Sequence, residues 1–133
     1  MTHEKEIEVR WRDLDSFGHV NHVVFLTYLE EARDEWLGRA LENPDDVWGY
    51  VVARVEIDYR RELTLEDDVV VARCSLERLG TKSVTTREWI LTGDGEVSAE
   101  AKAVLVARDE KTGASRVISD AERDAFEHAA VKT

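Results

Sequence analysis

The feature that most constrains the fold is one long helical pattern in residues 22–40. Apolar residues recur there at spacings of three, four and one, which places them on one face of a helix. This face consists of Phe25, Tyr28, Leu29, Ala32, Trp36, Leu37 and Ala40. Asn21 precedes the pattern and is a suitable N-cap. Val23, Val24 and Leu26 widen the apolar surface at the N-terminal end, so we expect that end to be deeply buried.

Alternation of apolar and polar residues predicts one strand before this helix and four after it. The predicted strands are residues 5–12, 51–59, 68–78, 82–92 and 96–108. A weaker helical pattern follows at 119–128, with Ser119 placed to cap it. The simplest fold for this order is of the α+β class, a five-stranded, mostly antiparallel sheet curled around one long central helix. One helix leaves the edge strands of such a sheet unpaired, so we expect dimerisation.

Length, charge and residue counts exclude several classes of function. The chain has 133 residues, which we expect to form a single domain (1–133) with its core at about 5–108. Its net charge of −11 disfavours nucleic-acid binding, which needs a basic face. No apolar run approaches the roughly 20 residues needed to span a bilayer, and the first ten residues lack the apolar stretch of a secretory signal. With one cysteine, Cys74, and four histidines, we expect no disulfide framework, no metal site and a cytoplasmic location.

The segment richest in chemistry is residues 11–33, WRDLDSFGHVNHVVFLTYLEEAR. It places two aspartates, Asp13 and Asp15, in a loop just before the predicted helix. The N-terminus of a helix offers unpaired amides and a positive dipole end, which can stabilise an oxyanion. A nearby carboxylate can attack a carbonyl or activate water. Asp13 and Asp15 are the candidates for that carboxylate, and Asp13 is also suited to hold the loop by hydrogen bonds.

This segment resembles the signature of the hotdog-fold acyl-CoA thioesterases of the 4-hydroxybenzoyl-CoA thioesterase-like group. That signature is an aromatic residue, then D-x-D-x-x-G-H-V-N, then an aromatic residue and tyrosine at helical spacing, then Glu-x-Ala-Arg. The matching residues are Trp11, Asp13, Asp15, Gly18, His19, Val20, Asn21, Phe25, Tyr28, Glu30 (or Glu31), Ala32 and Arg33. The resemblance implies a hotdog fold over about residues 5–108 and hydrolysis of a fatty or aromatic acyl-CoA to the free acid and CoA.

The resemblance also implies roles for individual residues. Asp15 matches the catalytic aspartate, which acts as nucleophile or general base, and the backbone amide of His22 matches the group that polarises the thioester oxygen. The His22 side chain is placed to orient water or substrate. The residues expected to bind substrate are Gly18, His19, Asn21, Tyr28, Arg60, Lys82 and Ser83. Coenzyme A is part of the substrate, so no cofactor is implied, and the expected assembly is a homodimer or homotetramer with a pocket between two subunits.

The chain departs from the family pattern after the predicted strand 51–59. The family usually carries Pro and then Gly-Asp there, whereas residues 59–63 of this chain are YRREL. Arg60 and Arg61 can therefore contact phosphate or pair with surface carboxylates. Three other functions stay open: a non-catalytic module that binds acyl-CoA or acyl-carrier protein, a hydratase or dehydratase of acyl thioesters, and an unrelated α+β ligand-binding fold.

Overall fold

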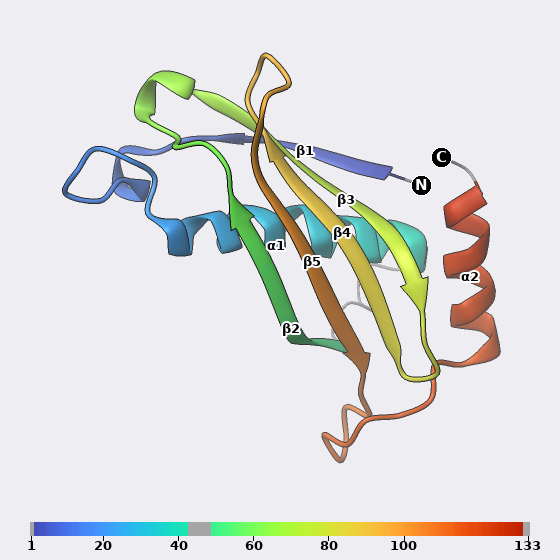
Figure 1. The fold of residues 1–133 in the computed structure, drawn as a ribbon. Helices are drawn as coiled ribbons and strands as arrows, with labels where there is room; N and C mark the ends of the chain where they lie inside the picture. The colour runs from blue at the N-terminus through green and yellow to red at the C-terminus, as the bar shows by residue number, and fades with distance from the viewer. Residues whose placement is uncertain (1, 43–48, 132–133) are drawn as a thin grey trace.

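Five strands form one antiparallel sheet, seen from its outer face in Figure 1. The structure is a computed structural model that describes residues 2–42 and 49–131. The strands are β1 (Thr2–Glu8), β2 (Tyr50–Tyr59), β3 (Val69–Leu79), β4 (Ser83–Leu91) and β5 (Val97–Ala107). They lie in the order β1-β3-β4-β5-β2, so β1 and β2 are the edges. The predicted α+β architecture, a sheet wrapped around one long helix, is confirmed.

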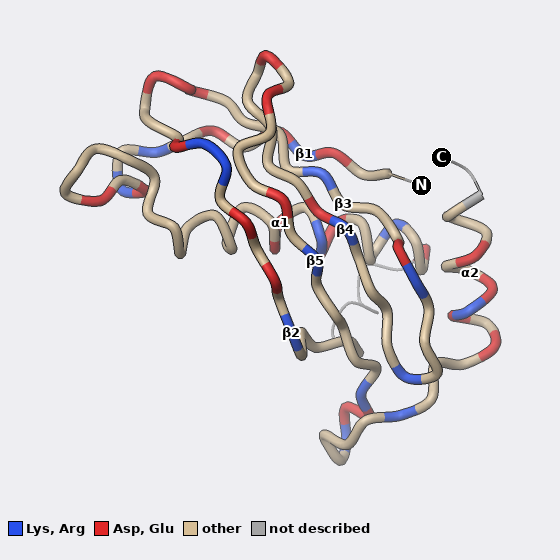
Figure 2. Tube along the Cα trace, viewed as in Figure 1, with Lys and Arg blue, Asp and Glu red and all other residues tan. Residues whose placement is uncertain are grey.

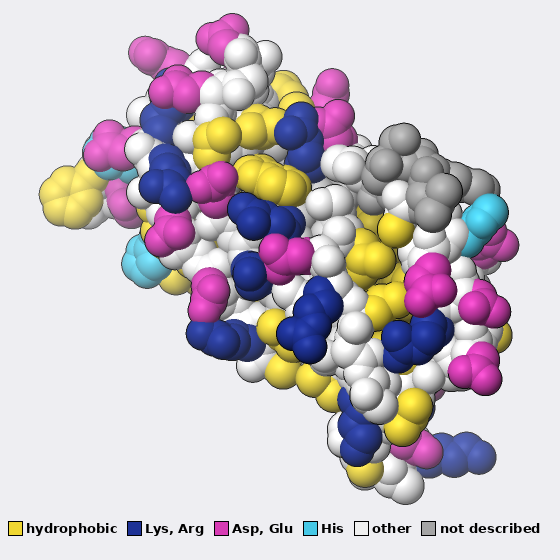
Figure 3. Space-filling view, turned by 45° about the vertical axis from the view of Figure 1, so that its right-hand side comes forward, with side chains coloured by type: hydrophobic (Ala, Val, Ile, Leu, Met, Phe, Trp, Pro, Cys, Tyr) yellow, Lys and Arg dark blue, Asp and Glu magenta, His cyan; other side chains and the backbone are white. Residues whose placement is uncertain are grey.

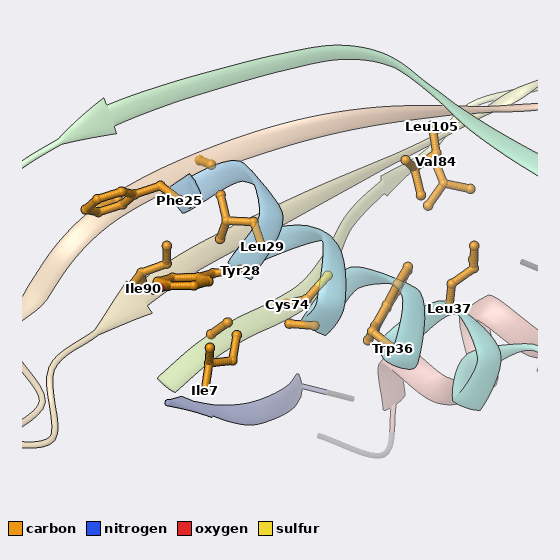
Figure 4. Packing of buried hydrophobic residues seen from close by; sticks show 14 of the residues in the cluster. Ile7, Phe25, Tyr28, Leu29, Trp36, Leu37, Cys74, Val84, Ile90 and Leu105 are labelled. Atoms are coloured by element: carbon orange, nitrogen blue, oxygen red, sulfur yellow. The ribbon is translucent and has the colours of Figure 1, made fainter. Parts of the chain in front are cut away.

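The long helix α1 (His22–Ala40) lies against the inner face of this sheet, with the bounds that the sequence predicts. Every residue of the predicted apolar face is buried. Figure 4 shows part of this core, in which Tyr28, Leu29 and Trp36 from α1 lie among side chains of the strands, such as Ile90 and Cys74. Burial of these side chains is the main contribution that fixes α1 on the sheet.

The first predicted strand, residues 5–12, is wrong at both ends. The strand begins earlier, at Thr2, and ends at Glu8, and residues 11–13 form a short 3-10 helix. The Asp13 carboxylate accepts a hydrogen bond from the Arg10 backbone amide at 2.9 Å, which curls the chain out of the sheet. Trp11, in this short helix, is 80% exposed.

The N-terminal end of α1 is not deeply buried in the single chain, contrary to expectation. Val23 is 55% exposed and Leu26 is 37% exposed. The nearest edge strand, β2, is itself mostly exposed, including the apolar side chains Val51 and Val52. A single chain therefore leaves apolar surface uncovered beside a free sheet edge.

A second helix, α2 (Asp120–Val131), covers the far end of α1. Ser119 caps it as predicted, because its hydroxyl accepts a hydrogen bond from the Glu122 amide at 3.1 Å. Phe126 stacks on Trp36 with ring centroids 5.9 Å apart, which fastens α2 to α1. No helix in residues 2–42 or 49–131 is long and apolar enough to cross a membrane.

The outer face of the sheet carries charges of both signs. Arg73 pairs with Glu4 at 2.7 Å across β3 and β1, and Arg87 pairs with Glu77 at 3.5 Å across β4 and β3. Figure 3 shows Lys and Arg side chains interleaved with Asp and Glu over this face. Such interleaving is typical of a solvated surface.

Candidate active site

The loop of Asp15 is a tight turn that fixes one carboxylate oxygen. The Asp15 Oδ1 atom accepts hydrogen bonds from the backbone amides of Phe17 at 2.9 Å and His19 at 3.2 Å. The Asp15 amide donates to the His19 carbonyl at 2.8 Å. Gly18 has φ +82°, a left-handed conformation that side chains resist, so glycine suits the closing position. Asp15 Oδ2 has no hydrogen-bond partner in the described part of the chain and is available to a reactant.

Asp13 anchors this loop from beneath. Its side chain is 2% exposed and accepts hydrogen bonds from the Arg10 guanidinium at 2.9 Å and the Tyr28 hydroxyl at 2.6 Å. Burial raises the pKa of Asp13, but these hydrogen bonds outweigh burial and hold the pKa below its usual value. The Asp13 carbonyl accepts from the Asn21 amide at 2.9 Å, which ties the loop to the start of α1. The hydrogen bonds predicted for Asp13 are thus present.

The first turn of α1 presents an unpaired amide. Asn21 is the predicted N-cap, and its side chain accepts a hydrogen bond from the Val23 amide at 3.0 Å. The Asn21 carbonyl accepts from the Val24 amide at 2.8 Å. The His22 amide lies between these bonds and has no acceptor within residues 2–42 and 49–131. A free amide at the positive end of a helix dipole attracts a carbonyl oxygen that gains negative charge.

Asp15 and His22 open on one hollow of about 310 Å³. Its lining residues are Asp15, His19, Val20, His22, Phe25, Tyr59, Arg60, Arg61 and Glu62. The structure therefore brings together four residues predicted for the site, which are Asp15, His19, His22 and Arg60. Gly18 and Asn21 flank them in the chain and shape the turn and the helix start.

Three other predicted residues do not reach this hollow. The hydroxyl of buried Tyr28 is committed to Asp13, and burial raises the pKa of that hydroxyl. Lys82 and Ser83 lie at the opposite end of the sheet, because Ser83 begins β4 near the Tyr50 end of β2 while the hollow lies at its Tyr59 end. Nine steps of strand separate those ends, or about 30 Å.

The cations beside the hollow are paired within the chain. Arg60 binds Glu100 at 2.8 Å, and Arg61 binds Asp67 and Glu96, each at 3.1 Å. Figure 2 shows these two arginines as a blue stretch beyond β2, with acidic residues on both sides. In the isolated chain this favours the interpretation of Arg60 and Arg61 as partners of surface carboxylates. Exposed pairs of this kind are weak, so they can exchange for a phosphate partner.

Sequence reasoning missed Tyr59, the last residue of β2. Its hydroxyl donates a hydrogen bond to the His22 carbonyl at 2.8 Å, and its ring packs edge-on against Phe25 with centroids 5.1 Å apart. Burial raises the pKa of Tyr59, so the hydroxyl stays protonated and can donate. Alternation alone marks Tyr59 as a strand residue, and nothing local relates it to a helix 37 residues away.

The arginine of the Glu-x-Ala-Arg match, Arg33, also has a partner that the sequence did not reveal. Its guanidinium makes two hydrogen bonds of 2.8 Å to the buried carboxylate of Glu88 on β4. Glu88 Oε2 also accepts from the Thr86 hydroxyl at 2.6 Å. Cys74 lies beside this cluster, and burial raises the pKa of its thiol well above the usual value, as expected for an inert packing residue. Across residues 2–42 and 49–131, no three His, Cys, Asp or Glu side chains converge to hold a metal ion.

Comparison with known proteins shows which family the chain belongs to. A family model described as the thioesterase-like superfamily matches residues 9–128. The chain belongs to the thioesterase-like superfamily. The long-chain acyl-CoA thioesterase FadM of Escherichia coli (strain K12) is 34% identical over 116 residues, which cover 82% of this chain and 85% of FadM.

Solved structures of this superfamily share the whole fold. A thioesterase from Thermus thermophilus, complexed with coenzyme A and Zn, superimposes with a TM-score of 0.88 at 31% identity over 98% of this chain and 96% of that one. A predicted thioesterase from Bacillus stearothermophilus superimposes with a TM-score of 0.87 at 27% identity, over 97% of this chain and 96% of that one. The resemblance noted in the sequence and the expected fold are confirmed, and the chain is an enzyme of the thioester-hydrolase class.

Proposed function

We propose that this chain hydrolyses a fatty or aromatic acyl-CoA to the free acid and coenzyme A. The observation that carries the proposal is that Asp15 and His22 line one hollow, and that the Asp15 Oδ2 atom and the His22 amide have no hydrogen-bond partner in the described residues. The kinship with FadM, a long-chain acyl-CoA thioesterase, supports an acyl-CoA as substrate. The coenzyme A bound to the Thermus thermophilus relative supports the same class.

In this proposal the thioester oxygen accepts a hydrogen bond from the His22 amide. As general base, Asp15 Oδ2 takes a proton from water while the water oxygen adds to the carbonyl carbon. The tetrahedral intermediate then loses the CoA thiolate, which receives the proton from Asp15. As nucleophile, Asp15 instead bonds to the carbonyl carbon, expels the thiolate and is freed when water hydrolyses the anhydride.

Both versions place the developing negative charge at the helix N-terminus. The exposed His22 ring stands at the edge of the hollow, where it can orient water or substrate. Neither version uses a cofactor, since coenzyme A belongs to the substrate. The buried, free thiol of Cys74 fits a reducing compartment, and we propose a cytoplasmic location.

We further propose that two chains pair through β2. This edge strand is exposed, and apolar side chains of β2 and of the first turns of α1 lie uncovered near it. Antiparallel pairing across a two-fold axis would set the Tyr50 end of one β2 beside the Tyr59 end of the other. Lys82 of the partner subunit would then lie near the end of the sheet that carries the Asp15 hollow, where its positive charge can pair with a phosphate of CoA. Two such dimers could join as a tetramer.

The test is free-thiol release from short, medium, long and aromatic acyl-CoA substrates, run on protein whose mass in solution is measured first. We expect turnover of at least one substrate by a dimer or tetramer. Thermal stabilisation by an acyl-CoA without product would instead identify a non-catalytic binding module. Val52→Glu, which puts a charge on the free edge, should yield monomers with lower turnover, while Val117→Glu, at an exposed site beyond the sheet, should change neither.

A further inference from the structure

The first turn of α1 is held by a side chain from the far end of β2. Tyr59 donates its hydroxyl hydrogen to the His22 carbonyl at 2.8 Å. Its ring meets Phe25 edge-on at 5.1 Å and the His22 ring at 6.2 Å. All three residues line the hollow that contains Asp15. Tyr59 therefore contacts the helix at His22, a residue that lines the hollow and whose amide has no acceptor in the described residues.

These contacts fix two successive peptide groups. The His22 carbonyl and the Val23 amide belong to one planar peptide group. Tyr59 holds its carbonyl, and the Asn21 side chain holds its amide at 3.0 Å. The preceding peptide group, which contains the His22 amide, is held at its carbonyl by the Val24 amide at 2.8 Å. With both planes fixed, the direction of the His22 N–H bond is fixed as well.

The anchor itself is rigid. Tyr59 pairs with Ala99 in the β2–β5 ladder. The next two amides, of Arg60 and Arg61, both donate to the Ser98 carbonyl, at 2.8 and 3.1 Å. The hydroxyl of fully buried Ser98 donates to the Arg61 carbonyl at 2.7 Å. The Tyr59 backbone thus cannot shift without breaking the end of the sheet.

We propose that Tyr59 is a positioning residue, which aims the His22 amide at the thioester oxygen by holding the first helical turn. This inference rests on the proposed hydrolase function. The first N–H groups of a helix have no helical acceptor that fixes their direction, and Val23 in this turn is exposed, so the His22 amide depends on the contacts that hold the neighbouring peptide groups. An amide aimed at an oxyanion acts mainly after attack has begun, so its alignment affects kcat more than KM.

The test compares two tyrosines of the same strand. Tyr59→Phe keeps the ring and removes only the hydroxyl. Tyr50→Phe is the matched control, because the Tyr50 hydroxyl donates at 2.8 Å to Glu122 at the other end of β2. Removing a whole oxyanion donor costs about 10²–10³ in kcat, so misaligning one should cost about tenfold. We expect Tyr59→Phe to lower kcat about tenfold with KM within about twofold, and Tyr50→Phe to leave both within about twofold.

Amide resonances of the free protein supply a readout that needs no turnover. In a 1H–15N spectrum, Tyr59→Phe should shift the His22 and Val23 signals, and Tyr50→Phe should not. An unchanged kcat in Tyr59→Phe, or equal changes in kcat and KM, overturns the inference. If the wild-type protein hydrolyses no acyl-CoA, the proposed function fails. The amide signals then test the positioning role alone. Shifted His22 and Val23 signals in Tyr59→Phe support that role, and unshifted signals overturn it.

Discussion

Replacing Arg33 by methionine should destabilise the protein more than any surface substitution. The guanidinium forms a bidentate pair with Glu88, and the two side chains are only 5% and 0% exposed. Burial lowers the pKa of Arg33, but the hydrogen bonds to Glu88 and the negative charge of Glu88 together outweigh burial and raise that pKa above its usual value. Arg33→Met leaves a buried carboxylate with Thr86 and Cys74 as its remaining donors. Losing one partner of a buried pair costs about 3–5 kcal/mol.

Thermal unfolding measures this cost, and all variants are compared at one fixed protein concentration, because the proposed dimerisation would make Tm depend on concentration. For a chain of this length about 3–5 kcal/mol corresponds to a fall in Tm of roughly 10–20 °C. The control Arg73→Met breaks an exposed pair with Glu4 and should cost less than about 1 kcal/mol. The double variant Arg33→Met/Glu88→Leu should recover most of the loss, since an apolar pair can replace a buried ion pair. Equal losses in Arg33→Met and Arg73→Met would refute the reasoning.

Three further variants test the N-cap, the α2 contact and the tight turn. Asn21→Ala removes the acceptor of the Val23 amide and should cost about 1 kcal/mol in urea unfolding; an unchanged midpoint would contradict the cap. Hydrogen bonds led by Arg116 lower the pKa of Glu122 from 4.5 to about 2, so this stabilisation is complete above pH 4.5 and is lost as pH falls toward 2. Glu122→Gln should therefore flatten the dependence of stability on pH between 4.5 and 2, and an unchanged slope would argue against it. Gly18→Ala meets no atom within 4 Å but keeps φ +82°, so it should cost about 1 kcal/mol from backbone strain alone, measured as a shift in the urea midpoint, and a neutral effect would speak against a strained turn.

The sequence predicted the elements whose signals are local. The helix 22–40 and its cap are encoded within one run of residues, and they agree with the structure. The strand at 5–12 failed because a local contact, Arg10 with Asp13, competes with the apolar alternation. Exposure of Val23 and Leu26 could not be foreseen, because burial there depends on what lies across the free edge of β2.

The same limit applies to the site. Asp15 was a candidate because it lies in the loop just before the helix, and the resemblance to the thioesterase signature implied its role and that of the His22 amide seven positions later. Tyr59 comes from another element, and only the path of β2 reveals its contact with α1. Lys82 was grouped with Asp15 by resemblance. The antiparallel topology instead places Lys82 and Asp15 at opposite ends of the sheet within one chain. Periodicity identifies elements, whereas contacts between distant elements need the fold.

The most direct test of the proposed mechanism is thiol release by Asp15→Asn on the preferred substrate of the wild type. Asparagine keeps an oxygen for the Phe17 and His19 amides but can neither take a proton nor attack a carbonyl. Asp109 offers a matched control, because its Oδ1 accepts from two amides, at 2.8 and 3.2 Å, in a similar turn. We predict that Asp15→Asn lowers kcat by about 10²–10⁴ without lowering Tm, while Asp109→Asn leaves kcat unchanged. Wild-type turnover by Asp15→Asn would contradict the account.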